Sequence, residues 1–345
     1  MPARLVLVVL LLATTLGRTG TAVADPACAN VPRDRQMSSA GISLTQKLGL
    51  ASGKYALPRT SAPRQLVVLM HGHGNDACAW RNHLRAVARH GAIGVAMDYS
   101  KQDPKTNRGW RVIEGAEDSI KAAKHFMRRF PSIKQVYAFG ISMGANTAGM
   151  AVASPDARRA DGSPLFDHLV AVEGVHDLIQ EYQAFRHVSA EFAEDVEAEA
   201  GGTFEEVPDR YVHLTNLARV QEMAYLRSAV LVHGVDDLLV AYSQSRDMAK
   251  ALRAMSVPTE LFTVVGRGDG ESGTTVSSEA GTPLFDAVGL ETYESPVAGH
   301  GWEGSDSHLV IRLGFEQLWK VMNGKVVGPY RETVVHGEGL RLPAP

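Results

Sequence analysis

Short apolar runs separated by amphipathic stretches make up most of the chain after residue 64. The runs occupy residues 65–72, 92–100, 133–140, 168–174, 229–234 and 259–266. Between them the apolar positions recur at helical spacing, as in residues 110–130. Strands that are buried on both faces appear as continuous apolar runs, so this alternation predicts a mostly parallel sheet with helices on both faces, an α/β fold.

Two segments interrupt the alternation. Residues 177–227 show no strand pattern and contain many acidic residues, which indicates a helical, cap-like insertion between two strands of the sheet. We interpret the acidic residues as a solvated helix face rather than as a metal site. Residues 266–298 are rich in Gly, Ser and Thr, and we expect them to form a long loop.

The N-terminus has the pattern of a secretory signal peptide. Arg4 precedes an apolar core from Leu5 to about Leu12, and small residues follow as far as Ala24. The apolar run is shorter than the ~20 residues that a membrane-spanning helix needs. We therefore expect cleavage after about Ala24 and a secreted protein without a stable membrane anchor. This divides the chain into a signal peptide (1–24), an N-terminal arm (25–64) and one large domain (65–345).

The chain has two cysteines, Cys28 and Cys78. An even number of cysteines in an exported protein favours a disulfide, and two free thiols are the alternative. We expect the disulfide. It would tie the N-terminal arm to the segment that follows "HGHG" at residues 71–74.

The charge balance excludes one class of partner. The chain has 35 Lys and Arg against 38 Asp and Glu, a net charge of −3. A nucleic-acid-binding protein would show a basic patch or a strongly basic domain, so we expect no nucleic-acid partner. The 45% of hydrophobic residues is enough for a full core.

Polar residues follow four of the predicted strands, at the edge where open parallel sheets bind ligands. They lie in the segments "HGHGND" (71–76), "GISMG" (140–144), "HGVDDLLV" (233–240) and "AGHGWEG" (298–304). The second segment has the G-x-S-x-G pattern, which places Ser142 on a turn between a strand and a helix. A serine hydroxyl is a weak nucleophile unless a base, and a group that orients the base, lie close by. We expect His300 to be the base and Asp237 the orienting acid.

This set of motifs resembles the α/β-hydrolase superfamily over residues 65–320, because Ser142, Asp237 and His300 follow one another in the order which that fold uses. "LVHGVDD" and the following "SQSRDMAKAL" resemble the prolyl-oligopeptidase-like branch, without its propeller domain. The His-Gly-x-x-Asp pattern of that branch favours Asp237 over the adjacent Asp236. His308 is the alternative base, but it lies where the final helix is expected to begin.

The negative charge that develops on the substrate oxygen needs hydrogen-bond donors. The first is the N–H of Met143, the residue after the nucleophile, at a helix N-terminus. The resemblance implies that the second is the N–H of His73. His71 and His73 could also be a metal pair, but no third ligand lies near them, so we expect no metal and no cofactor.

We therefore predict a secreted serine hydrolase that cleaves a small-molecule or polymeric carboxylic ester through an acyl-enzyme. Hydrolysis of a peptide or amide bond is the alternative activity, and a binding protein of the same fold without turnover is the alternative class. Four aromatic residues near strand ends are candidate walls of the acyl pocket, with core packing as the alternative for each: Trp80, Tyr99, Trp110 and Trp302.

Overall fold

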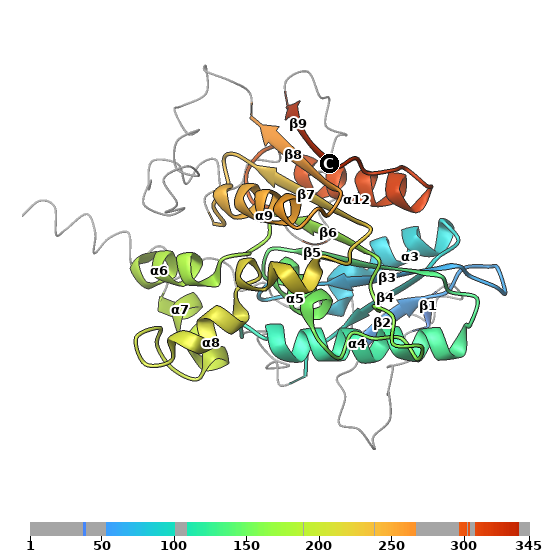
Figure 1. The fold of residues 1–345 in the computed structure, drawn as a ribbon, viewed down its shortest axis with the longest axis horizontal. Coiled ribbons are helices and arrows are strands. Elements are labelled where there is room, and N and C mark those ends of the chain that lie inside the picture. The colour runs from blue at the N-terminus through green and yellow to red at the C-terminus, as the bar shows by residue number, and fades with distance from the viewer. Residues whose placement is uncertain are drawn as a thin grey trace, which may run out of the picture.

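A computed structural model describes residues 37–38, 53–100, 109–188, 190–237, 239–266, 297–301, 303 and 308–337. Across these residues nine strands form one sheet, in the order β1-β2-β4-β3-β5-β6-β7-β8-β9 (Figure 1). The strands are β1 (Met37–Ser38), β2 (Gly53–Ala56), β3 (Gln65–Met70), β4 (Ile93–Met97), β5 (Gln135–Ile141), β6 (His168–Val172), β7 (Ser228–Gly234), β8 (Thr259–Val265) and β9 (Tyr330–His336).

All strands from β4 to β9 along the sheet are parallel, whereas β1 and β2 form an antiparallel edge. All six predicted strands are present, and the predicted α/β-hydrolase fold class is confirmed. The sequence analysis missed the two short strands before residue 57, and it missed β9, which pairs with β8 at the other edge.

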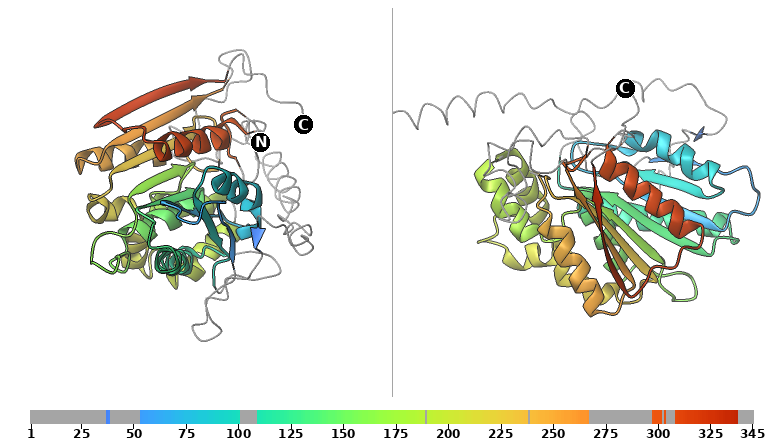
Figure 2. Two further views of the ribbon diagram at one scale, coloured as in Figure 1. Left: turned by 90° about the vertical axis from the view of Figure 1, so that its right-hand side faces the viewer. Right: turned by 90° about the horizontal axis from the view of Figure 1, so that it is seen from above.

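Helices cover both faces of the sheet (Figure 2). One face carries α3 (Arg81–Arg89) and α12 (Leu309–Met322), and the other carries α4 (Val112–Arg129), α5 (Met143–Ala153) and α9 (Ser243–Ala254). Successive side chains of a strand point to opposite faces. In β3, accordingly, Leu66, Val68 and Met70 join the core under α4 and α5, while Val67 and Leu69 join the core under α3 and α12.

Residues between β6 and β7 form a helical insertion. It contains α6 (Leu178–Val188), α7 (Ala190–Ala200), α8 (Pro208–Leu214) and the 3-10 helix η2 (Leu217–Met223); a second 3-10 helix, η1 (Ala77–Trp80), precedes α3. Asp195 of α7 contacts His73 in the loop after β3, so the insertion lies against the carboxyl edge of the sheet. Among the described residues, no helix has the length and apolar character needed to cross a membrane.

Several predicted features lie outside the described residues. These are the signal peptide, most of the N-terminal arm, nearly all of the loop at 266–298, Cys28 and Trp302. The cleavage site and the pairing of Cys28 with Cys78 therefore stay predictions.

Candidate active site

Ser142 joins the end of β5 to the start of α5 in a strained conformation. Its φ of 55° and ψ of −125° lie in a region that costs a residue with a side chain ~1–3 kcal/mol. Its N–H donates to the carbonyl of Val172 on β6 (3.0 Å), and its carbonyl accepts from the N–H of Ala145 (2.9 Å). These bonds hold the serine at the carboxyl edge of the sheet, with little of its surface exposed.

The glycines on either side of Ser142 are required by close backbone contacts. A Cβ on Gly140 would lie 2.1 Å from the carbonyl oxygen of Gly144. A Cβ on Gly144 would lie 2.1 Å from the carbonyl oxygen of Met70 at the end of β3. Both distances are far below van der Waals contact, so the G-x-S-x-G pattern reflects an elbow packed tightly against the neighbouring strand.

His300 and Asp237 form a fully buried pair at the same edge. Nδ1 of His300 lies 2.7 Å from Oδ2 of Asp237. The other oxygen of Asp237, Oδ1, accepts the N–H groups of Leu239 (2.9 Å) and Val240 (2.8 Å). Asp237 follows β7 and Ser142 follows β5, so the two are separated by two strand spacings, ~10 Å, a gap that an imidazole between them spans.

Burial and the mutual attraction of the two charges shift the pKa values of Asp237 and His300 in opposite directions. Burial raises the pKa of Asp237, but the charge of His300 and hydrogen bonds from His233 and His300 outweigh it and hold the pKa below its usual range. Burial lowers the pKa of His300, and the neighbouring Asp237 carboxylate outweighs it and raises the pKa to about 9. The pair is therefore built to hold an imidazolium, the species that forms when a histidine accepts a proton from a nucleophile.

The alternative residues lie elsewhere. Asp236 is turned toward Gly266, and burial raises its pKa to about 6. His308 precedes α12 as its N-cap residue. The structure thus brings Asp237, rather than Asp236, to His300.

The loop after β3 lies directly against the serine elbow. A Cβ on Gly72 would be 3.4 Å from the Cβ of Ser142. Tyr99 packs against this loop. Its ring stacks on that of His71 with centroids 3.9 Å apart, and its hydroxyl donates to the His71 carbonyl (3.0 Å). The backbone of His73 follows next along this loop, and the N–H of Met143 is the first of α5, where no intrahelical acceptor exists.

Two glutamates at this edge, the fully buried Glu173 and the partly buried Glu303, were not among the predicted site residues. Glu303 accepts hydrogen bonds from the N–H of Gly72 and from Nδ2 of Asn75 (2.6 Å), and burial raises its pKa to about 7. Glu173 follows β6 and accepts the N–H of Gly301 (2.7 Å). Both lie in segments that the sequence had already singled out, the apolar run 168–174 and "AGHGWEG" (298–304), and that placement was the available signal.

Residues 109–275 match the sequence model of the prolyl oligopeptidase family. The matched segment is somewhat less than half of the chain and contains both Ser142 and Asp237. The chain is therefore similar to serine hydrolases of the prolyl oligopeptidase-like branch. No match was found among curated proteins.

Solved structures with the same fold include a puromycin hydrolase, a peptidase and an esterase. The chain is 15% identical to the puromycin hydrolase, with a TM-score of 0.53 over 85% of this chain and 38% of that one. Against a puromycin-hydrolyzing peptidase of Mycobacterium tuberculosis the values are 15% identity, a TM-score of 0.53, and 83% and 39% coverage. The esterase Est2 of Thermogutta terrifontis is also 15% identical, with a TM-score of 0.52 over 81% of this chain and 94% of the esterase. The chain thus spans about two fifths of the length of the puromycin hydrolase and of the peptidase, and the alignment covers nearly all of the esterase.

Oxygen and nitrogen atoms of Glu173, Asp237 and His300 lie within 4.8 Å of one another, a spacing that could hold a metal ion. The 2.7 Å separation between Nδ1 and Oδ2 is that of a hydrogen bond, however, and the two atoms share a proton between them. The contact between Asp237 and His300 is therefore suited to orienting the imidazole as a base.

The candidate pocket residues have different surroundings. Trp80 is fully buried between α3 and α12, with its ring 5.8 Å from that of Phe139, so for Trp80 the structure favours the core alternative. Tyr99 supports the loop after β3, as described above. Trp110 is buried beside His73 and Phe185, with ring centroids 6.3 and 5.8 Å away, and its Nε1–H donates to Asn146 (3.2 Å). Of these residues, Trp110 is the one that contacts both the loop and the insertion.

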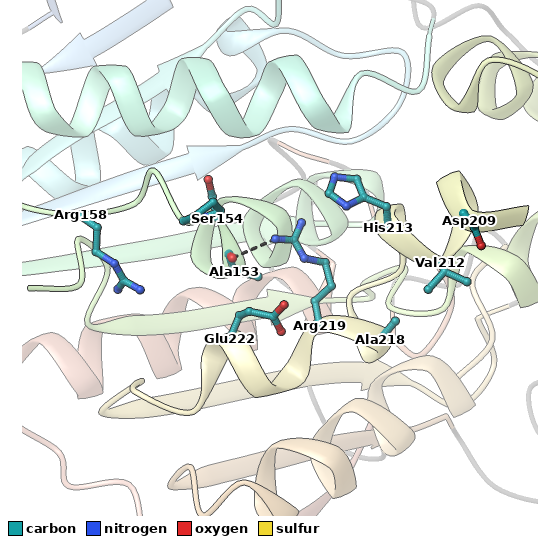
Figure 3. Close-up of a pocket in the computed structure, with 10 residues that line it drawn as sticks. Ala153, Ser154, Arg158, Asp209, Val212, His213, Ala218, Arg219 and Glu222 are labelled. Carbon is teal, nitrogen blue, oxygen red and sulfur yellow. Dashed lines mark hydrogen bonds between the residues drawn. The ribbon is translucent and has the colours of Figure 1, made fainter. Parts of the chain in front are cut away.

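A surface hollow of about 640 Å³ lies at the far end of α5 (Figure 3). Arg219 reaches into it and donates from Nη2 to the carbonyl of Ala153, the last residue of α5 (2.9 Å). A cation at a helix C-terminus offsets the negative end of the helix dipole, so Arg219 has a structural role there. The 11 residues of α5, ~16 Å of helix, separate this hollow from Ser142.

Proposed function

We propose that the hydrolase cleaves carboxylic esters through an acyl-enzyme, with Ser142 as nucleophile, His300 as general base and Asp237 as the orienting acid. The observation that carries the proposal is the buried Asp237–His300 pair at the edge where the strained Ser142 elbow ends β5. Pair and elbow come from separate strands and meet at the carboxyl edge, where ligands bind in such sheets.

The reaction proceeds in two halves. Ser142 Oγ attacks the carbonyl carbon as Nε2 of His300 takes its proton, and the imidazolium is held by Asp237. The N–H groups of Met143 and His73 donate to the oxyanion of the tetrahedral intermediate. Collapse expels the alcohol, which receives the proton from His300. A water molecule then repeats the sequence on the acyl-enzyme and releases the acid and free Ser142.

The likeness in fold to the esterase Est2 supports an ester substrate, because the alignment includes 94% of that esterase. The family match supports the second candidate, cleavage of a peptide or amide bond. We further propose that the mature protein is secreted, starting at Asp25, since residues 1–24 have the composition of a signal peptide.

A two-part experiment tests the proposal. A fluorophosphonate probe should label the wild-type protein covalently and leave Ser142→Ala unlabelled. Wild-type protein that has not been exposed to the probe is then assayed on p-nitrophenyl esters of increasing chain length beside aminoacyl p-nitroanilides. A higher kcat/KM on the esters supports an esterase, a higher value on the anilides supports the peptidase candidate, and labelling of the Ser142→Ala variant would refute the nucleophile. N-terminal sequencing of the exported protein tests cleavage after Ala24.

A further inference from the structure

Glu173 occupies a strained position beside the catalytic pair. Its φ is 47°, and among the described residues it shares a positive φ with two other non-glycine residues, Ser142 and Ser256. Its own N–H donates to the carbonyl of Val232 on β7 (2.8 Å). A residue with a side chain at such a φ is strained, and strained residues of this kind gather at functional sites. Here Ser142 and Glu173 end the neighbouring strands β5 and β6.

The carboxyl group of Glu173 contacts the segment that carries His300. Oε2 accepts the N–H of Gly301 (2.7 Å) and lies 4.0 Å from Nδ1 of His300, the atom that Asp237 contacts. The side chain of Glu173 is fully buried. A glutamine could accept the same N–H without the cost of burying an ionisable group. The acid at this position therefore calls for a role that an amide lacks.

Protonation of Glu173 is linked to that of His300. Burial raises the pKa of Glu173 to about 8, and the charge of His300 opposes the rise. Below that pH the carboxyl group is neutral, and above it a second negative charge faces Nδ1 and favours the imidazolium. Asp237 and Glu303 also act on both Glu173 and His300. Glu181 of α6 acts on Asp237 and His300, and Nε2 of His233 on β7 lies 3.3 Å from Oδ2 of Asp237.

We propose that Glu173 is a positioning residue of the acyl-transfer site, which fixes the His300 segment through Gly301 and acts with Asp237 to hold the imidazolium. The inference rests on the proposed role of His300 as general base. It assigns two separate contributions to one side chain: an acceptor, which glutamine can replace, and a charge, which it cannot.

Titration of His300 by NMR in the full-length protein tests the charge. Histidine-labelled wild type and Glu173→Gln are compared, and the His300 signal is assigned by its absence in His300→Gln. Removal of a carboxylate near an imidazolium lowers the imidazole pKa, so we expect the pKa of His300 to fall by about one unit in Glu173→Gln. An unchanged pKa would overturn the proposal.

Glu199→Gln is the matched control. Glu199 on α7 also accepts a backbone N–H, that of Ile113 (2.8 Å), and burial raises its pKa to about 7. Its charged neighbours are Arg111 and Glu114, and it does not contact His300. We expect Glu199→Gln to leave the pKa of His300 in place, and a shift equal to that of Glu173→Gln would count against a specific role for Glu173.

Kinetics separate the two contributions. In Glu173→Gln the acid limb of the kcat/KM profile on p-nitrophenyl acetate should move to lower pH, together with the NMR pKa. In Glu173→Ala, which also frees the N–H of Gly301, kcat should fall by a further factor of about 10 with KM nearly unchanged. Equal kcat in the two variants would refute the acceptor role. If wild type fails to react with the fluorophosphonate probe or any ester or anilide, the proposed function fails, and the NMR titration still decides on Glu173.

Discussion

Replacement of Asp237 by Asn changes one oxygen to an NH2 group and leaves the shape of the side chain intact. The N–H groups of Leu239 and Val240 both donate to Oδ1, so the amide oxygen of Asn must take that place. The NH2 group then occupies the position of Oδ2 and donates to Nδ1 of His300, 2.7 Å away. Nδ1 must therefore be unprotonated and Nε2 must carry the hydrogen, which is the wrong tautomer for a base that accepts the proton of Ser142.

The size of the effect follows from the pKa of His300. The pKa is raised from 6.5 to about 9, with burial acting downward and Asp237 upward. At ~1.4 kcal/mol per pKa unit, loss of the carboxylate charge removes on the order of 3 kcal/mol of imidazolium stabilisation, or roughly 10²-fold in rate. The wrong tautomer adds to this, so we expect kcat on p-nitrophenyl acetate to fall by roughly 10³–10⁴-fold.

Asp236→Asn is the control, because Asp236 is adjacent in sequence and lies away from His300. Burial raises the pKa of Asp236 to about 6, so replacing its carboxyl group by a neutral amide removes less charge stabilisation than the same change at Asp237. We expect kcat within about 3-fold of wild type, as for a residue that acts on no reacting atom. The reasoning fails if Asp237→Asn keeps more than a tenth of the wild-type kcat, or if Asp236→Asn is the more damaging change.

Three further predictions concern the elbow and the cysteines. Ser142→Ala should fold, judged by circular dichroism, and lose ~10³-fold or more of the wild-type kcat, and near-normal turnover would mean another nucleophile. Gly140→Ala places a Cβ 2.1 Å from the Gly144 carbonyl oxygen, so we expect Tm to drop and the free energy of unfolding to fall by about 3 kcal/mol; an unchanged Tm would contradict the packing described for the elbow. Reduction of a bond between Cys28 and Cys78 should lower the free energy of unfolding by about 3–4 kcal/mol and also lower kcat, whereas two reactive thiols in the unfolded, unreduced protein would show that the bond is absent.

The sequence was sufficient to predict the strands whose apolar runs are continuous, β3 to β8. It was insufficient for β1 and β2 at one end of the sheet and for β9 at the other. In β9 the exposed and half-buried residues of "YRETVVH" alternate irregularly, because helices cover this edge strand less than the central ones. Nothing local distinguishes such a segment from a loop, and pairing with β8 is what makes it a strand.

The order of the motifs was enough to predict Ser142, Asp237 and His300, whereas Glu173 and Glu303 became apparent only in the structure. A glutamate at the end of a strand is usually solvated, so Glu173 and Glu303 gave no chemical signal until their buried partners were known. Trp80 is the opposite case, a residue that the sequence suggested for the site and that the structure places in the core. It lies close in sequence to the loop after β3, but its side chain points into the core on the face covered by α3 and α12. Sequence spacing locates a backbone, and the direction of a side chain depends on the tertiary packing.

The contact between His73 and Asp195 joins the loop after β3 to the helical insertion. Nε2 of His73 lies 2.7 Å from the carboxylate of Asp195 on α7, and the ring of Phe192 meets the same imidazole edge-on at 4.7 Å. Any displacement of α7 must either break this contact or move the loop after β3 with it. The residues that shape the insertion are therefore not free to vary independently of the reaction centre. A change of substrate preference made by remodelling α7 will carry a cost in turnover unless the anchor at position 195 is kept.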